Sequence, residues 1–217
     1  MKILNKIDLE NTYFVIWTTT TWTLPGNMAI ALHPREKYAV VKAGNENYIV
    51  AEALAGKVMA AGGIEEYETV LTMPGREFEF MTARHPFLDR DSIVVNADYV
   101  TMDSGTGCVH TAPGFGVDDY YTGMRYGIRI CVPVDDRGYQ TEEAGKYAGM
   151  FYSESNKAIL ADMQESGALF ASQEMVHQYP HCWRCKHPII FRATPQWFCS
   201  VESFKDQAVA AIENVQW

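Results

Sequence analysis

The amino-acid sequence predicts a mixed α/β fold that is rich in strands, with a barrel-like β core and surrounding helices. Strand-type segments dominate the first two thirds of the chain, and most links between them are short. This pattern favours a barrel-like arrangement over alternating parallel βαβ units. The length of 217 residues suits one large domain, and a hydrophobic content of 47% is ordinary for a protein with a real core.

The expected strands are short runs of β-branched and aromatic residues bounded by turn-forming residues. Thr12–Trp17 (TYFVIW) and Ser92–Asn96 (SIVVN) show this pattern most plainly. A hairpin turn is expected at Gly44–Asn47, because glycine and asparagine accept the backbone angles of tight turns. The other expected strands are Met28–Leu32, Tyr38–Ala43, Tyr48–Ala51, Tyr67–Met73, Glu79–Ala83 and Cys108–Thr111.

Four segments are expected to be helical. Glu52–Ala61 is rich in alanine and is followed by Gly62, a typical stop signal. Val117–Tyr126 opens with Asp118, whose negative charge favours a helix N-terminus. The remaining two expected helices are Ser153–Ser166 and Phe204–Val215.

The composition narrows the possible functions. The chain has 18 Lys and Arg residues against 27 Asp and Glu residues, which gives a net charge of −9. Such a chain is not expected to coat nucleic acid through bulk charge, so contact with RNA would be local and DNA is not an expected partner. No apolar stretch approaches the ~20 residues of a membrane helix. The N-terminal segment also lacks the apolar core and cleavage site of a secretory signal.

Cysteine usage points to a reducing cytoplasm. The five cysteines are irregularly spaced, which argues against a secreted disulfide framework. Cys182 and Cys185 form a Cys-x-x-Cys pair, half of a tetrahedral zinc site. His181 and His187 are poor candidates to complete it, because adjacent residues rarely close such a tetrahedron. A second cysteine pair outside this chain is the alternative, and a redox role lacks a thioredoxin-like context.

A threonine-rich segment, WTTTTWTLPGN at residues 17–27, is the first candidate for chemistry. Each hydroxyl is a donor and an acceptor, so a run that leaves the extended form can gather hydroxyls and backbone N–H groups on one polar ligand. A sugar hydroxyl or an ester carbonyl would be such a ligand. The alternative is a threonine-rich strand with exposed hydroxyls, since threonine favours strands.

A glycine-rich segment, DSGTGCVHTAPGFGVDDY at residues 103–120, is the second candidate. His110 lies near the end of an expected strand, where it could be a neutral wall or a proton carrier. Asp119 lies in the first turn of an expected helix and could bind a cationic group such as an α-ammonium. The alternatives are a packed histidine and a carboxylate favoured by the helix dipole. The glycine spacing fits neither a P-loop nor a Rossmann fingerprint.

Taken together with YPHCWRCKHPIIFRATPQWF at residues 179–198, these segments resemble the editing domain of isoleucyl-tRNA synthetases. The resemblance runs from about Tyr13 to Phe198 with the three motifs in the family's order. It implies the inserted editing-domain fold that valyl, leucyl and isoleucyl enzymes share. The HTAPG that follows GTGCV is similar to isoleucyl rather than valyl or leucyl members. The HIGH-type and KMSKS-type ATP-binding motifs are absent, so ATP-dependent activation would belong to the parent enzyme.

The resemblance implies hydrolysis of mischarged Val-tRNA(Ile) after transfer, with no cofactor for editing. In this family, Thr18, Thr19, Thr20 and Asp119 would be the catalytic group, with Asp119 also holding the α-ammonium. The residues that would bind or shape the substrate are Trp22, Thr23, Asn27, His110, Phe115 and Asp119. Thr21 departs from the proline of many members, which implies a looser loop.

The resemblance also implies a domain organisation. Residues 1–217 would be one editing domain cut from a longer synthetase, with an editing core at about 13–175 and a return segment at about 176–217. Cys182 and Cys185 would then be half of a zinc site completed in the full-length parent. The expected partners are the 3′ end of aminoacylated tRNA(Ile) and the remaining parent domains. The rivals are a valyl-type editor that removes threonine, a module that binds the tRNA end without hydrolysis, and a zinc-ribbon-like interaction module.

Overall fold

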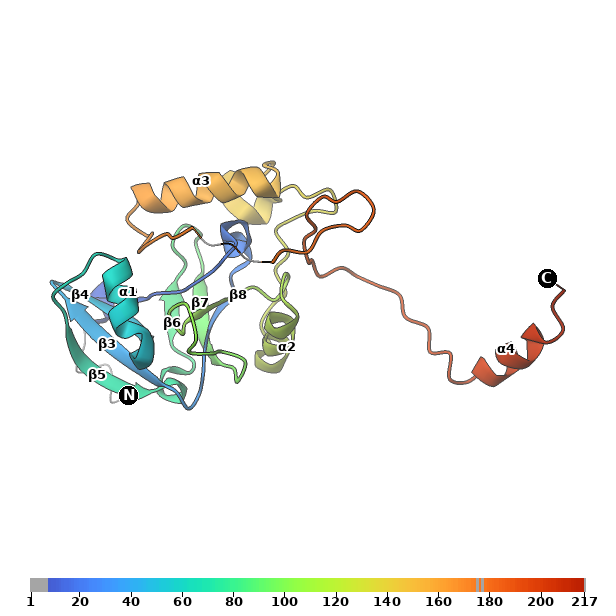
Figure 1. Cartoon of the computed structure of the whole chain (residues 1–217), viewed down its shortest axis with the longest axis horizontal. Helices are drawn as coiled ribbons and strands as arrows, with labels where there is room; N and C mark the ends of the chain where they lie inside the picture. The colour runs from blue at the N-terminus through green and yellow to red at the C-terminus, as the bar shows by residue number, and fades with distance from the viewer. Residues whose placement is uncertain (1–7, 175, 177, 217) are drawn as a thin grey trace.

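The computed structural model describes residues 8–174, 176 and 178–216. Its core consists of two four-stranded mixed sheets with helices around them, which confirms the strand-rich α/β class (Figure 1). The strand order is β1-β4-β3-β5 in the first sheet and β6-β7-β2-β8 in the second. The strands are β1 Thr12–Phe14, β2 Ala29–Leu32, β3 Lys37–Ala43, β4 Glu46–Ala51, β5 Glu68–Pro74, β6 Thr82–Arg84, β7 Asp91–Asn96 and β8 Val109–Thr111.

Each sheet contains one parallel pair, β1 with β4 and β2 with β7, while the other pairings are antiparallel. The expected hairpin turn is confirmed, because β3 and β4 pair up to Ala43 and Glu46 around Gly44. Gly44 has a positive φ of 60°, which a side chain would strain.

The helices lie close to their expected positions. They are α1 Ala55–Ala61, α2 Val117–Tyr126, α3 Tyr152–Glu165 and α4 Lys205–Ile212. Short 3₁₀ turns are η1 Leu9–Asn11, η2 Thr21–Gly26, η3 Glu52–Leu54, η4 Gly75–Phe78 and η5 Glu142–Tyr147. The expected helix over Glu52–Ala61 is thus divided into η3 and α1.

The expected strand at Glu79–Ala83 is wrong over most of its length. The chain turns there instead, since the Met81 N–H bonds to the Phe78 carbonyl at 3.1 Å and Phe80 has a positive φ of 65°. Phe78 is fully buried while Phe80 is exposed, so the alternation of phenylalanine with glutamate reflects a turn beside the core.

The small and large residues of β2 pack on opposite faces of the second sheet. Ile30 and Leu32 join the main core, which they share with β3, β4 and α1. Ala29 and Ala31 face a second cluster that includes Tyr126 at the end of α2. A third cluster packs Leu24 of η2 against η5 and α3. This third cluster holds η2 against α3.

The C-terminal part of the chain runs away from this body and ends near α4 (Figure 1). Trp197 and Phe198 are almost fully exposed along it, at 102% and 92%. The expected division at about 175 and 176 stays a prediction, and Met175 itself lies outside the described residues. Residues 1–7, 177 and 217 of the expected domain also lie outside them.

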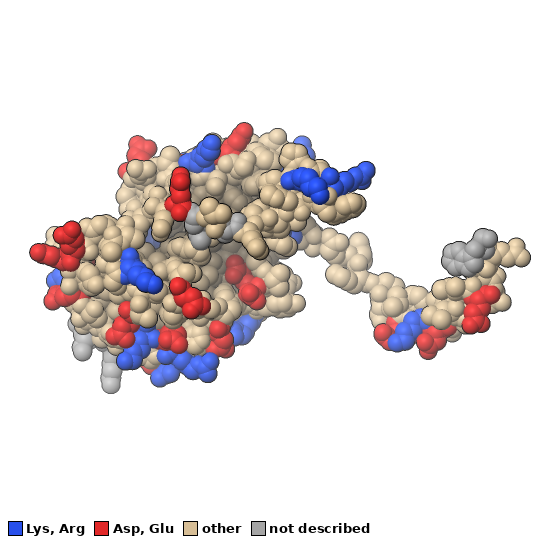
Figure 2. Space-filling view, viewed as in Figure 1, with Lys and Arg blue, Asp and Glu red and all other residues tan. Residues whose placement is uncertain are grey.

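All five cysteines are unpaired. Within the described ranges, no helix has the length and apolar character needed to cross a membrane. Basic and acidic side chains are interspersed over the face of the molecule shown in Figure 2.

Candidate functional site

The threonine-rich segment begins where the two sheets meet. The Val15 N–H bonds to the Ile49 carbonyl in the first sheet, and the Trp17 N–H bonds to the Cys108 carbonyl beside the second. The chain then leaves the extended form, as a ligand-gathering segment requires, and η2 begins at Thr21. The Thr18 hydroxyl accepts the Thr20 N–H at 3.1 Å, and the Thr19 side chain is exposed.

His110 lies on β8 and is buried against η2 and the residue that follows it. Its Nε2 lies 3.1 Å from the Thr23 hydroxyl, and its Nδ1 lies 2.6 Å from the Asn27 amide nitrogen. The Ser92 hydroxyl on β7 donates to the Asn27 Oδ1 at 2.5 Å. One hydrogen-bonded chain therefore joins β7, β8, the middle of η2 and the residue that follows η2.

The partners of Asn27 decide the tautomer of His110. A carbonyl oxygen only accepts hydrogen bonds, so the Asn27 atom that lies 3.0 Å from the Ala29 carbonyl oxygen must be the amide nitrogen, Nδ2. The same Nδ2 is the atom that lies beside His110 Nδ1. His110 Nδ1 must then accept, and Nε2 carries the hydrogen that it donates to the Thr23 hydroxyl. The Thr23 hydroxyl in turn donates to the Thr20 carbonyl oxygen at 2.8 Å.

Burial keeps His110 neutral. Burial, with smaller contributions from the nearby His85 and Arg90, lowers the pKa of His110 to about 3. With Nδ1 occupied as an acceptor and Nε2 already protonated, the ring is a hydrogen-bonding wall and is poorly placed to take a proton. Of the two roles left open by the sequence, the neutral wall fits the geometry.

Trp22 and Phe115 form the aromatic part of the site. Their ring centroids lie 5.0 Å apart at 74°, and the Tyr152 ring centroid lies 5.2 Å from that of Trp22. A Cβ added at Gly26 would lie 2.7 Å from the Phe115 ring, so the glycine allows this close approach. The edge-to-face geometry is the arrangement that aromatic pairs prefer.

Asp119 lies half-buried in the first turn of α2. Its Oδ2 accepts the Ala112 N–H at 2.9 Å, and its Oδ1 lies 3.4 Å from the Tyr99 hydroxyl. Burial raises the pKa of Asp119, and nearby Asp118 adds to the rise. Among the described residues no ion pair involves Asp119. The carboxylate thus keeps lone pairs for a cationic group.

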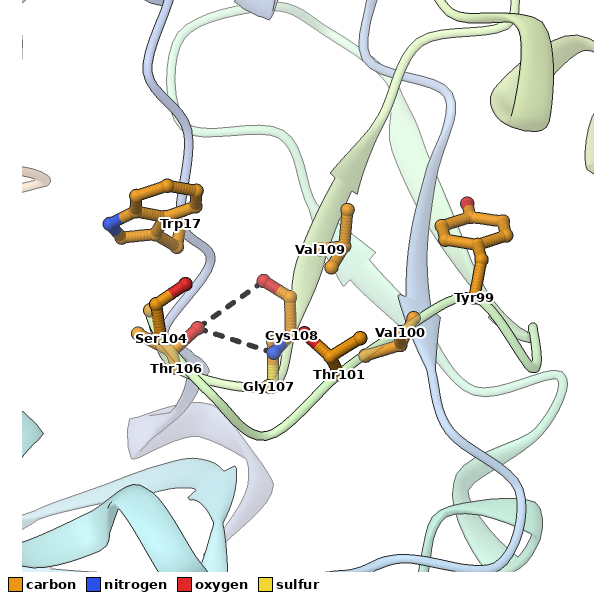
Figure 3. A pocket seen from close by; sticks show the side chains of 10 residues that line it. Trp17, Tyr99, Val100, Thr101, Ser104, Thr106, Gly107, Cys108 and Val109 are labelled. Atoms are coloured by element: carbon orange, nitrogen blue, oxygen red, sulfur yellow. Dashed lines mark hydrogen bonds between the residues drawn. The ribbon is translucent and has the colours of Figure 1, made fainter. Parts of the chain in front are cut away.

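A hollow of about 120 Å³ lies beside Trp17, between the segment before η2 and the glycine-rich loop (Figure 3). Gly105 allows the loop to approach the indole, because a Cβ there would lie 3.0 Å from the ring. The Thr106 hydroxyl accepts the Cys108 N–H at 3.2 Å and shapes the turn. The hollow is smaller than the ~300–1,000 Å³ typical of small-molecule pockets, so it would hold only part of a ligand.

The Cys-x-x-Cys pair lies in a tight turn. The Cys182 N–H bonds to the His187 carbonyl, and the Lys186 N–H bonds to the Cys182 carbonyl. Backbone N–H groups of Cys185 and Arg184 point at the Cys182 sulfur and lower its pKa. This environment fits a thiolate ligand. Within the described part of the chain no group of three or more potential ligands accompanies it.

Several contacts that build the site come from residues with no motif of their own. Asn156 on α3 and Gln140 bind the backbone of Trp22 at 3.0 Å each. His85 bonds to the Leu24 carbonyl at 3.0 Å, and Arg90 bonds to the Pro25 carbonyl. These residues are far from η2 in sequence, so no local pattern could have indicated them.

Comparison with known proteins gives sequence relatives along almost the whole chain, although no family model matches. The isoleucine–tRNA ligase of Caldicellulosiruptor bescii is 51% identical over 208 residues, and that of Petrotoga mobilis is 53% identical over 210 residues. Each match covers 96% of this chain and 23% of the relative. The chain thus spans less than a quarter of the length of these relatives.

Solved structures share the fold at low sequence identity. The crystal structure of GlLeuRS-CP1 matches with a TM-score of 0.62 over 80% of this chain and 91% of that chain, at 17% identity. The editing domain of the P. knowlesi cytosolic leucyl-tRNA synthetase matches with a TM-score of 0.52 over 76% and 87%, at 13% identity. Sequence and fold together place this chain in the isoleucine–tRNA ligase family, in the part of those enzymes that forms the editing domain.

Proposed function

We propose that the chain hydrolyses the aminoacyl ester of mischarged Val-tRNA(Ile) after transfer, as the editing domain of a cytoplasmic isoleucine–tRNA ligase. The observation that carries this proposal is the half-buried Asp119 carboxylate, which has no cationic partner among the described residues and is tied to Ala112, two residues after His110. An α-ammonium group is a cation that would supply the missing charge, and an aminoacyl ester carries one.

The threonine segment suits the ester end of such a substrate. Water would attack the carbonyl carbon, the bond to the ribose oxygen would break, and valine and tRNA with a free hydroxyl would leave. Hydroxyls and backbone N–H groups at Thr18–Thr20 would orient the water and stabilise the developing oxyanion. His110 is not the base in this scheme, because its Nδ1 already accepts a hydrogen bond from Asn27.

The wall formed by His110, Trp22 and Phe115 suits a size limit on the amino-acid side chain. Double-sieve editing in isoleucine enzymes is a general example of such a limit, because one methylene in an apolar pocket is worth only ~1–3 kcal/mol. His110 is fixed at both ring nitrogens, so it cannot turn aside easily to admit a larger group. The hollow beside Trp17 would hold part of the terminal nucleoside, with the indole as a stacking surface.

Zinc is a separate part of the proposal. Cys182 and Cys185 would contribute two thiolates to a structural zinc site whose other ligands lie in the rest of the ligase. Zinc held there would order the turn at residues 181–188 and takes no part in ester hydrolysis.

A hydrolysis panel tests the proposal. Valine-, threonine- and isoleucine-charged tRNA(Ile) would be incubated with the chain, alone and within the longer ligase, and release of the amino acid measured. We expect release of valine and little release of isoleucine. Preferential release of threonine would favour the valyl-type editor, and binding of all three without release would leave a module that only holds the tRNA end.

A further inference from the structure

Asn156 stands out among the residues that contact η2. It lies half-buried within α3, although asparagine is a poor helix former away from helix ends. Its Oδ1 accepts the Trp22 N–H at 3.0 Å and lies 2.5 Å from the Thr21 hydroxyl. The same hydroxyl lies 2.9 Å from the Asn156 carbonyl oxygen. One helix residue therefore binds two consecutive residues of η2.

The same face of α3 also meets the Trp22 ring. Tyr152 is four residues before Asn156, so the two side chains project from one side of the helix. Tyr152 packs edge-to-face on the indole at 5.2 Å, while Phe115 packs on it at 5.0 Å. Gln140 completes the arrangement by donating to the Trp22 carbonyl at 3.0 Å. Both the backbone and the ring of Trp22 are thus fixed by residues outside η2.

The contact of Thr21 corrects one expectation from the sequence. Its departure from proline implies a looser loop, yet its hydroxyl bonds to Asn156 across 135 positions of sequence. Proline at this position would have restricted one backbone angle but offered no hydroxyl. The threonine therefore ties η2 to α3 through its side chain.

We propose that Asn156, together with the Thr21 hydroxyl, is a positioning residue that fixes Trp22 and thereby sets the size limit of the amino-acid pocket. This inference rests on the proposed editing function, because the pocket has a size limit only if an amino-acid side chain enters it. The indole lies in the same wall as Phe115 and next in sequence to Thr23, which binds His110. A shift of Trp22 by a methylene's width would therefore admit a larger side chain.

Two variants remove the contacts, and two matched variants keep them. Asn156→Ala removes the Oδ1 acceptor, and Thr21→Val replaces only the hydroxyl with a methyl group. Thr21→Ser keeps the hydroxyl. Lys157→Ala changes the next residue of α3, whose side chain is exposed. For each, the ratio of valine to isoleucine release from charged tRNA(Ile) is measured. The Trp22 signal is followed by fluorine NMR of the chain labelled with fluorotryptophan and assigned with Trp22→Phe.

We expect Asn156→Ala and Thr21→Val to shift or broaden the Trp22 signal and to lower the valine preference by about tenfold or more, as a methylene-sized change in a pocket does. Thr21→Ser and Lys157→Ala should keep the Trp22 signal and the valine preference of the unaltered chain. An unchanged signal and preference in folded Asn156→Ala would overturn the inference. If Asn156→Ala does not fold, Thr21→Val decides by the same two measurements. If the unaltered chain releases no amino acid, the proposed function fails, and an unmoved Trp22 signal would then also overturn the positioning role.

Discussion

His110 shows how one residue can be assigned a role from its partners alone. The Ala29 carbonyl fixes the amide of Asn27, that amide fixes the tautomer of His110, and the tautomer leaves Nε2 as a donor to Thr23. A histidine held in this way is a wall of defined size. We therefore propose that His110 acts in substrate selection and that the threonine segment carries the hydrolytic chemistry.

His110→Ala should relax this selection. Removing the imidazole enlarges the pocket and leaves Thr23 and Asn27 to bind water, so isoleucine should be accepted. We expect release of isoleucine from Ile-tRNA(Ile) to rise by about 10–200-fold, the range for a methylene-sized change in fit. Release of valine should persist. An unchanged ratio of isoleucine to valine release would remove His110 from the selecting wall.

Asp119→Asn tests the ammonium anchor with little change in shape. The amide keeps an acceptor for the Ala112 N–H but carries no charge for the substrate. Losing one partner of a buried charge pair costs about 3–5 kcal/mol, so kcat/KM for Val-tRNA(Ile) should fall by roughly 10²–10⁴-fold. Asp118→Asn is the matched control, because that neighbouring side chain is exposed. Equal effects of the two changes would mean that only the net charge of the helix end matters.

At the scale of elements, the glycine-rich loop depends on close approach. Gly107 has a φ of +77°, and a Cβ there would lie 2.4 Å from the Ala51 Cβ. The Tyr38 hydroxyl also donates to the Gly107 carbonyl at 2.6 Å from within the core. The loop that borders the Trp17 hollow is thus packed directly on β3 and β4.

Gly107→Ala should destabilise the fold by about 2–6 kcal/mol, from backbone strain of ~1–3 kcal/mol and overpacking of ~1–3 kcal/mol. Gly44→Ala separates these causes, because Gly44 has a φ of +60° but no atom within 4 Å of an added Cβ. That variant should show the strain alone. Urea unfolding of Gly107→Ala and Gly44→Ala measures the difference between their losses of unfolding free energy. Equal losses would show that the contact with Ala51 is relieved by a small shift of the chain.

The elements themselves differ in how far the sequence could predict them. The helix α2, Val117–Tyr126, matches the expected range because acidic residues open it and Gly127 ends it with a φ of 64°. The turn at Phe78–Met81 was missed because its alternating apolar pattern is also that of a strand. Asn156 and Gln140 were missed for a different reason. Their contacts with η2 span more than a hundred residues and leave no local pattern.

For the whole molecule, the charge of −9 and the scattered basic side chains agree with a body that does not hold a tRNA by bulk charge (Figure 2). Under the proposed function, the candidate site needs to bind only the aminoacylated 3′ end of the tRNA. Exposed apolar side chains are concentrated after residue 180, where Trp183, Trp197 and Phe198 have little cover. We propose that the remaining three quarters of the ligase contact this segment and hold the body of the tRNA.

The whole fold should be sensitive to acid through two buried histidines. Burial lowers the pKa of His85 to about 4 and that of His110 to about 3, against an ordinary value of 6.5. Above about pH 6.5 both histidines are neutral in the folded and in the unfolded chain, so the stability that they contribute is fully present there. As the pH falls below 6.5, only the unfolded chain gains these protons, and the folded state loses stability until the folded pKa values are reached.

The free energy of unfolding should therefore fall by about 1.4 kcal/mol per pH unit for each histidine between about pH 6 and pH 4. Asp119 acts in the opposite direction near pH 4, because burial raises the pKa of its carboxyl. Urea unfolding at pH 7, 6, 5 and 4.5 measures the slope. His85→Gln keeps an amide that can donate to the Leu24 carbonyl, and it should remove about half of the slope. A slope equal to that of the unaltered chain would show that His85 is already protonated in the folded state.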